Sequence, residues 1–221
     1  MSPPIGLERV ELSGNTPVHL LQAHLSRYVW AMGYCPGKRV LDVGCGVGYG
    51  SWVMKVMGGA REVVGIDPHA ASLRYARRSF SEVHYGVAKV ETYEPEEPFE
   101  VITAMEVVEH CGDVGAALDA LRRLLTPGGV LLASLPLHQP SVYHHGRNYG
   151  YAEWYGLVSP RFLICDLLYQ PVGGCLGVSN VMVQPVSHLR GQISAWPASP
   201  KDTMGHPSFG VVVLELRGRS A

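Results

Sequence analysis

The sequence has few cysteines, and none of them form a closely spaced pair. No C-x-x-C pattern occurs among the five, which are Cys35, Cys45, Cys111, Cys165 and Cys175. A disulfide framework or a zinc knuckle needs such pairs, so the pattern favours neither and favours a reducing compartment instead.

A membrane span and a secretion signal are missing as well. The longest uncharged apolar stretch, residues 130–137, is far too short to cross a bilayer. The first residues, MSPPIGLERVELSG, show no basic region followed by an apolar one, as a secretion signal would. We therefore expect a cytoplasmic protein without membrane insertion.

Acidic and basic side chains are nearly equal in number. Eighteen basic and nineteen acidic side chains give a formal net charge of −1. Proteins that bind a phosphate backbone usually carry a basic excess, so the balance argues against nucleic acid as a partner. Hydrophobic residues make up 47% of the 221 residues, which is enough for a sizeable globular core.

The apolar pattern predicts alternating strands and helices. A helix is expected after the N-cap signal Thr16-Pro17. The predicted strands cover residues 39–44, 62–66, 101–104, 130–135, 161–169 and 209–217. The helices between them cover residues 51–57, 68–80 and 114–125, with a turn at 126–129. This alternation predicts an α/β fold, with a mainly parallel sheet covered by helices on both faces.

The most informative of the 26 glycines follow the strand at residues 39–44. The segment VLDVGCGVGYGS leads from a buried strand into Gly44, Gly46 and Gly48, which let a ligand approach the backbone closely. Asp67 ends the next strand, where an acid can accept hydrogen bonds from both hydroxyls of a ribose. Together these features predict a site for an adenosine-type ligand.

The spacing of the glycines distinguishes between such ligands. The dinucleotide fingerprint G-x-G-x-x-G needs a third glycine where this chain has Tyr49. Asp42, two residues before the glycines, would repel a pyrophosphate but tolerates an ammonium group. The pattern therefore favours S-adenosylmethionine, whose amino-acid end is a zwitterion, over a nicotinamide cofactor.

At this point the sequence resembles the class I S-adenosylmethionine-dependent methyltransferases. VLDVGCGVGYGS resembles their first motif, VVGIDP their ribose-binding motif, FEVITAMEVVEH their fourth motif, and LRRLLTPGGVLLASLP their following turn and fifth strand. The four motifs occur in the family's order over residues 39–136. The resemblance implies a Rossmann-like, doubly wound sheet of seven strands, mainly parallel with an antiparallel last strand, here preceded by the predicted N-terminal helix.

The resemblance also implies which residues bind the cofactor. They are Asp42, Gly44, Gly46 and Gly48 at the methionine end, Asp67 at the ribose, Pro68 beside the adenine, Met105 from the fourth motif, and Val87. Val87 departs from the family pattern, which often has an acid or amide there to reach the adenine amino group. We expect backbone groups to replace that side-chain contact.

The string Glu106-Val-Val-Glu109-His110 follows the fourth-motif strand, at the sheet edge where such folds bind ligands. If it turns helically, Glu106, Glu109 and His110 share one face and could bind Mg²⁺ or Mn²⁺, with a further ligand from His138, His144 or His145. A similar E-x-x-E-H group ligates magnesium in small-RNA 2′-O-methyltransferases, and E-V-x-E-H is common in O-methyltransferases of quinone biosynthesis. The alternatives are that His110 or Glu109 acts as a metal-free base, or that the segment only caps and packs.

The loop after the fifth strand is rich in histidine and aromatic residues. HHGRNYGYAEW resembles the family segment H-x-R-E-Y-[ST]-x-x-E-[LF]. Within it, His144 and His145 are further candidate catalytic bases for a hydroxyl acceptor. The composition suits a hydroxylated or ring-bearing substrate, and the alternative is a solvated loop.

The predicted N-terminal helix carries HLSRYVWA, which resembles an H-x-x-R-Y-x-x-A helix of methyltransferases in glycan and polysaccharide pathways. Such a helix can fold over the cofactor as a lid. We expect Arg27 to pair with the cofactor carboxylate, with plain packing as the alternative role for Tyr28 and Trp30.

We interpret residues 1–221 as a single methyltransferase domain, with an N-terminal extension at 1–37, a cofactor-binding core at 38–136, and the substrate loop and C-terminal strands at 137–221. The predicted function is O-methylation of a small polar or sugar-containing metabolite by in-line methyl transfer. The alternatives are a metal-assisted RNA 2′-O-methyltransferase, a nicotinamide-dependent oxidoreductase and a non-catalytic S-adenosylmethionine-binding protein.

Overall fold

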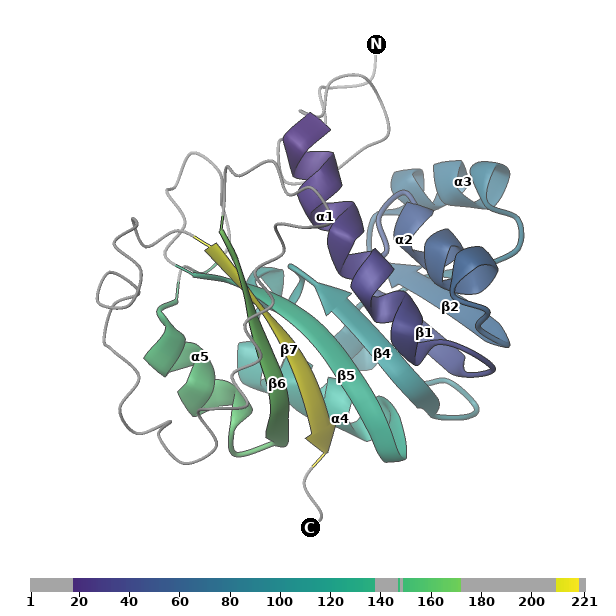
Figure 1. Cartoon of the computed structure of the whole chain (residues 1–221). Helices are drawn as coiled ribbons and strands as arrows, with labels where there is room; N and C mark the ends of the chain where they lie inside the picture. Colours follow the sequence, from purple (N-terminus) through teal and green to yellow (C-terminus); the bar gives the residue numbers. More distant parts are fainter. Residues whose placement is uncertain (1–17, 138–146, 148, 172–209, 219–221) are drawn as a thin grey trace.

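A seven-stranded sheet organises the chain (Figure 1). The computed structural model describes residues 18–137, 147, 149–171 and 210–218. The strand order is β3-β2-β1-β4-β5-β7-β6. The strands are β1 Arg39–Val43, β2 Glu62–Asp67, β3 His84–Val87, β4 Phe99–Met105, β5 Leu125–Leu137, β6 Phe162–Pro171 and β7 Gly210–Gly218. The order reverses between β1 and β4, so the carboxyl ends of these two strands form the edge where such sheets bind ligands.

The pairing of the strands confirms the predicted mixed sheet. β1 to β5 pair in parallel. β7 runs antiparallel to both β5 and β6, as the resemblance implied for the last strand. The final strand lies between β5 and β6 (Figure 1).

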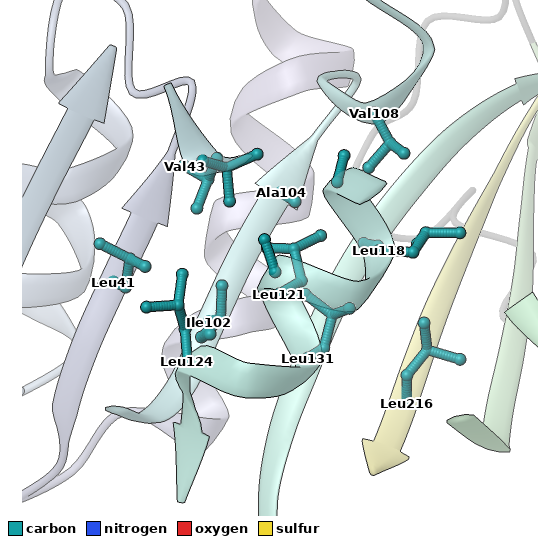
Figure 2. Packing of buried hydrophobic residues seen from close by; sticks show 14 of the residues in the cluster. Leu41, Val43, Ile102, Ala104, Val108, Leu118, Leu121, Leu124, Leu131 and Leu216 are labelled. Carbon is teal, nitrogen blue, oxygen red and sulfur yellow. The ribbon is translucent and has the colours of Figure 1, made fainter. Parts of the chain in front are cut away.

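Helices cover both faces of the sheet, as its continuous apolar strands require. They are α1 Val18–Ala31, α2 Tyr49–Trp52, α3 Ala70–Ser79, α4 Val114–Leu124 and α5 Tyr151–Val158. One face of the sheet packs against α4, with Leu118 and Leu121 over Ile102 and Leu131 (Figure 2). The other face packs against α1 and the turn after α2, with Tyr28 and Met54 among its buried residues.

Two elements differ from their predicted form. The helix expected at residues 51–57 is α2 followed by a π-helical turn, Val53–Met57. The turn expected at 126–129 lies inside β5, as an irregularity rather than a break. Pairing with β4 jumps from Leu125, opposite Phe99, to Val130, opposite Val101. The residues between them bulge, and Gly128 has a φ of 78°.

The N-terminal helix is present, and the Thr16-Pro17 cap lies outside the described residues. Among the helices that the structure describes, none is long and apolar enough to cross a bilayer. A cytoplasmic location stays a prediction from the sequence.

Candidate cofactor and active site

The glycine loop after β1 adopts a backbone that side chains rarely tolerate. Gly44, Gly46 and Gly48 have φ values of 68°, 54° and 88°. A Cβ on Gly44 would overlap the side chain of Val107, and one on Gly48 would lie 2.5 Å from the hydroxyl of Tyr85. A Cβ on Gly46 would meet no atom within 4 Å. The loop is therefore packed tightly at both ends and open in its middle, where a ligand can approach the backbone.

Asp67, at the carboxyl end of β2, is tied to this loop. One carboxylate oxygen accepts a hydrogen bond from Gly46 N at 3.0 Å, and the other accepts one from His69 N at 2.7 Å. The side chain is buried. Each oxygen keeps acceptor capacity, so Asp67 can receive the ribose hydroxyls that the sequence assigned to it.

Asp42 lies beneath the loop rather than on its surface. Its carboxylate is fully buried and accepts hydrogen bonds from the hydroxyls of Ser51 at 2.6 Å, Thr103 at 2.7 Å and Tyr28 at 3.3 Å. Burial raises its pKa to about 6, although the three hydroxyl donors oppose the shift. Because this carboxylate joins α1, α2 and β4, Asp42 braces the loop through these elements, and its place at the methionine end of the cofactor stays a prediction.

The expected adenine side of the site is apolar and open. Val87 ends β3 directly opposite Asp67 in the parallel register, and its side chain is 54% exposed. Pro68 beside it is also exposed. An exposed apolar pair next to the acid that the sequence predicts to bind ribose suits the flat face of a base. The structure thus brings Val87, Pro68 and Asp67 together as the sequence predicted.

The turn after β4 is the second element at this edge. Met105 ends the strand and is buried in the face under α1. Glu106 follows with a φ of 54°, which is rare for a residue with a long side chain. Its N–H donates to the carbonyl and the hydroxyl oxygen of Ser134, at 3.1 and 3.0 Å. Ser134 on β5 thus holds Glu106 in a strained conformation.

Arg27 of α1 reaches this turn. Its guanidinium lies 3.2 Å from a carboxylate oxygen of Glu106 and 3.4 Å from the hydroxyl oxygen of Ser134. Arg27 is 6% exposed. The sequence placed Arg27 at the cofactor carboxylate, and the structure does bring it to the ligand edge of the sheet, beside a carboxylate of the protein.

Sequence reasoning missed the role of His24, one helical turn before Tyr28. Its Nδ1 lies 2.6 Å from the hydroxyl of Tyr49, the residue that follows the glycine loop. Burial and the nearby Arg27 lower the pKa of His24 to about 4, while Glu106 opposes the shift. His24 is therefore neutral and attaches α1 to the loop. The H-x-x-R-Y spacing puts it on the same face as Arg27 and Tyr28, which was the available signal.

The predicted metal-binding face of Glu106, Glu109 and His110 is not formed. Because Glu106 is left-handed, residues 106–110 do not make one helical turn, and only Val108–His110 forms a 3-10 turn. Within the part of the chain that the structure describes, no group of three or more His, Cys, Asp or Glu side chains is placed to hold a metal ion. The proposed extra ligands His138, His144 and His145 lie outside the described residues.

Glu109 is the most unusual group of this turn. Its carboxyl is fully buried, and neither oxygen has a hydrogen-bond partner among the residues that the structure describes. The distance from its Oε1 to His110 Nε2 is 4.0 Å, too long for a hydrogen bond. Burial raises its pKa well above the ordinary value, and the nearby Glu106 adds to this. The imidazole of His110 is 39% exposed, so the two candidate bases differ sharply in their surroundings.

The described part of the loop after β5 lies against the same turn. Arg147 N donates to the carbonyl of Glu109 at 3.1 Å, and its guanidinium donates to the carbonyl of Gly112 at 2.6 Å. Beyond it, Trp154 of α5 is buried and donates from its indole to the carbonyl of Pro136 at 2.9 Å. The loop predicted to recognise substrate therefore borders the candidate bases.

A family comparison agrees with this arrangement. The sequence model described as a methyltransferase domain matches residues 21–163, which include most of α1, the glycine loop, the turn after β4 and α5. The chain belongs to the methyltransferase domain family. The family match excludes the nicotinamide-dependent oxidoreductase as a description of this chain.

The methyltransferase domain also has curated relatives. It is 37% identical over 102 residues to the ubiquinone biosynthesis O-methyltransferase of Bradyrhizobium sp. strain ORS 278, covering 44% of this chain and 40% of the relative. It is 35% identical over 131 residues to the protein of the same description from Xanthomonas campestris pv. campestris, covering 58% and 55%. The chain thus spans about half the length of the curated relatives it matches.

Solved structures share the fold at low sequence identity. The N-methyltransferase NodS of Bradyrhizobium japonicum, in complex with S-adenosyl-L-homocysteine, superposes with a TM-score of 0.66 at 14% identity, covering 97% of both chains. A S-adenosylmethionine-dependent methyltransferase of Thermotoga maritima gives 0.65 at 16% identity, covering 91% of this chain and 92% of that one. At such identities the likeness shows the fold alone.

Proposed function

We propose that this methyltransferase domain transfers the methyl group of S-adenosylmethionine to a hydroxyl oxygen of a small polar or sugar-containing metabolite. The observation that carries the proposal is the open glycine loop beside Asp67. Its middle glycine has no neighbour on the ligand side, and the acid that would hold a ribose is fixed by the same loop. The O-methyltransferase names of the curated relatives support oxygen as the acceptor atom.

The described residues fit the cofactor. Gly44, Gly46 and Gly48 would accommodate its methionine end, Asp67 would bind the ribose, and Val87 with Pro68 would flank the adenine. The bound cofactor supplies a methyl group on a positively charged sulfur, which makes that methyl reactive without further activation. The remaining task of the protein is to align the acceptor, exclude water and remove one proton.

The proton of the acceptor hydroxyl needs a nearby base. His110 is the best placed among the described residues, because its imidazole is partly exposed beside the turn after β4. Glu109 is a second candidate, and His144 and His145 remain candidates from the sequence. The transfer makes one C–O bond and breaks one S–C bond, and the base takes the hydroxyl proton.

Thermal-shift measurements test the cofactor part of the proposal. We expect S-adenosylmethionine and S-adenosylhomocysteine to raise Tm by several degrees at 1 mM, because a ligand at about 100 times its Kd stabilises by about 2.7 kcal/mol. NAD should have no effect. Stabilisation by NAD alone would contradict the proposal.

Turnover tests the acceptor part. Formation of S-adenosylhomocysteine should be measured with a panel of hydroxylated aromatic compounds and sugars, with amines of matched shape as controls. Turnover on the amines alone would show that nitrogen is the acceptor. His110→Asn should lower kcat by about 100-fold if it removes the base, since general-base catalysis typically contributes that much.

A further inference from the structure

Charge is unevenly distributed over the molecule, although the whole chain is nearly neutral. Residues 48–83, which run through α2, the π-helical turn and α3, carry five basic and three acidic side chains. Residues 89–119, which run from the end of β3 into α4, carry one basic and nine acidic side chains. Because α1, α2 and the end of α3 pack on one face of the sheet and α4 on the other, the molecule has a basic and an acidic side.

Few acids offset the arginines of α3. This helix contributes three exposed basic side chains and no acid: Arg74, Arg77 and Arg78. Of the three acids in residues 48–83, Asp67 is buried at the ligand edge and Glu62 is paired with Arg39 at 2.7 Å. Glu82 is the third, and it is exposed. The side of the molecule around α3 therefore presents a net positive charge.

The same side exposes apolar side chains. Among the described residues, six large hydrophobic side chains are strongly exposed, and four of them belong to α1, the π-helical turn and α3: Val29, Val56, Met57 and Tyr75. Met57 is 61% exposed and Val56 49%. Trp52 and Phe80, both half-buried, contact each other with ring centroids 5.9 Å apart and connect α2 to the end of α3. Apolar and basic side chains thus share one surface.

We propose that this surface, formed by α1, the π-helical turn and α3, binds the surface of a bilayer that contains anionic phospholipid. Guanidinium groups bind lipid phosphates, and exposed apolar side chains enter the boundary between headgroups and acyl chains. The acidic side around α4 is repelled by the same bilayer, so charge alone turns α3 toward the lipid. Such a contact needs no membrane-spanning helix. The inference goes beyond the proposed function and does not depend on it.

The side chains of this surface favour lipid over two other occupants. A second copy of the chain using the same surface would bring two basic surfaces together, and these repel each other. A single-stranded nucleic acid is bound by basic side chains together with aromatic rings that stack on the bases. The most exposed apolar side chains here, Val56 and Met57, are not aromatic and suit acyl chains better.

The surface leaves the ligand edge of the sheet accessible. Met57 and Phe80 come shortly before the first residues of β2 and β3. The apolar part of the surface therefore lies toward the amino ends of these strands, whereas the glycine loop and the turn after β4 lie at the carboxyl ends. Membrane contact and methyl transfer are thus compatible with each other.

Vesicle binding tests the inference without the cofactor. Sedimentation measures the partition of the full chain onto vesicles of phosphatidylcholine alone and onto vesicles of phosphatidylcholine and phosphatidylglycerol in equal parts. We expect partition onto the anionic vesicles to be at least about tenfold stronger. Most of this difference should vanish when NaCl rises from about 0.1 M to about 1 M, because the Debye length falls from about 10 Å to about 3 Å.

Two paired substitutions separate the basic from the apolar part of the surface. Arg74→Gln combined with Arg78→Gln should weaken partition onto the anionic vesicles at least about tenfold. Val56→Ser combined with Met57→Ser should weaken it at least about fivefold, because less apolar area leaves water. Thermal unfolding of each variant shows that it is folded.

The matched control is Arg122→Gln combined with Arg123→Gln, which removes two arginines from the last turn of α4 on the acidic side. It should change the partition less than about twofold. An equal loss in this control and in the α3 variant would indicate an effect of net charge alone and would overturn the inference.

Other results would overturn it as well. These are equal partition onto both kinds of vesicle, partition onto neither, or stronger binding to a single-stranded RNA than to the anionic vesicles at the same salt concentration. The last result would make nucleic acid the occupant. A chain that bound anionic vesicles but not S-adenosylmethionine would contradict the proposed function and leave this inference standing, so the two failures are distinct.

Discussion

The loop after β1 and the turn after β4 lie side by side at one edge of the sheet, yet they are held in opposite ways. In the loop, the left-handed residues are glycines, and the acids Asp67 and Asp42 have donors for both oxygens. In the turn, the left-handed residue is Glu106, and the buried carboxyl of Glu109 accepts no hydrogen bond within the described part of the chain. The loop therefore has a relaxed backbone and acids with hydrogen-bond donors, whereas the turn has a strained backbone.

The difference separates two tasks. A loop of glycines offers backbone N–H groups to a bound nucleoside and lets it approach closely. The protein alone supplies the contacts that hold this loop in its conformation. Strain and unpaired polar groups persist only where the surrounding structure enforces them, and they gather at functional sites. We infer that the loop holds the cofactor and that the turn carries the selective and chemical groups.

Substitution of the glycines should have the largest effect and tests whether the loop is held by packing. Gly44→Ala and Gly48→Ala each place a methyl group against Val107 or Tyr85 in a left-handed backbone. We expect each to lower the free energy of unfolding by about 3 kcal/mol, from backbone strain and overpacking together. Urea unfolding measures this loss.

Gly46→Ala should behave differently, because its methyl group would meet no protein atom. Its unfolding free energy should fall by only about 1 kcal/mol, the cost of the left-handed backbone. Its affinity for S-adenosylhomocysteine should fall more than about tenfold, since the methyl group would stand in the space proposed for the ligand. Gly33→Ala, with open space and no left-handed φ, is the control; unchanged affinity in Gly46→Ala would contradict the cofactor assignment.

Removal of the Glu109 carboxyl, which has no hydrogen-bond donor among the described residues, should have the next largest effect on stability, in the opposite direction. Glu109→Met replaces a buried carboxyl by an apolar side chain of similar volume, and we expect stability to rise by about 1–2 kcal/mol. Tm should rise by about 2–6 °C in a thermal scan. Turnover should fall if Glu109 takes part in the chemistry.

Glu215→Met is the matched control for this change. Glu215 is partly buried but accepts a hydrogen bond from Tyr34 at 2.9 Å and lies 3.2 Å from Arg217. Its replacement should lower Tm. If Tm also fell for Glu109→Met, the Glu109 carboxyl would be stabilised in the turn as well as the acids are in the loop.

The same contrast explains what the sequence could predict. A left-handed backbone at Gly44, Gly46 and Gly48 favours glycine, so the preference is visible in the sequence as glycines at fixed spacing. The short apolar runs of the buried parallel strands are visible in the same way. The mainly parallel sheet was therefore predicted from the residues, whereas its antiparallel last strand and the positions of Pro68 and Val87 beside Asp67 followed from the family resemblance.

The turn after β4 could not be read in this way. Its conformation depends on Ser134 and Arg27, which lie 28 and 79 positions away from Glu106 along the chain. No local sequence pattern predicts a left-handed glutamate. The helical spacing of Glu106, Glu109 and His110 was sound as a pattern, but the strained residue breaks the helix. The burial of Asp42 was not visible for a similar reason, because its three hydroxyl partners come from three other elements.

Asp42, beneath the loop, should have a smaller effect on the free energy of unfolding, and this effect should depend on pH. Burial raises the pKa of Asp42 to about 6, above its value in the unfolded chain, so the folded protein binds the proton more tightly. This contribution to stability is present at low pH and is lost as pH rises through about 6. Between pH 7 and pH 5, the protein should gain about 1 kcal/mol from this group.

Asp42→Asn should lack this gain, because an amide does not titrate. The measurement is urea unfolding of both proteins at pH 7 and pH 5, and the comparison uses the change within each protein, so groups common to both cancel. An equal change in the two proteins would mean that Asp42 is already satisfied as a carboxylate, and the loop would then be even more relaxed than we infer.

The smallest effect should come from Tyr85→Phe, which decides how far side chains support the loop. The Tyr85 hydroxyl donates to the carbonyl of Gly48 at 3.2 Å, and its loss should cost about 0.5–1 kcal/mol of unfolding free energy, the net value of one such bond. Affinity for S-adenosylhomocysteine should change less than about threefold. Tyr75→Phe, at a half-exposed tyrosine of α3, should change neither. If Tyr85→Phe cost as much as Gly48→Ala, the loop would depend on a side chain from a distant strand, as the turn does, and the contrast between the two elements would disappear.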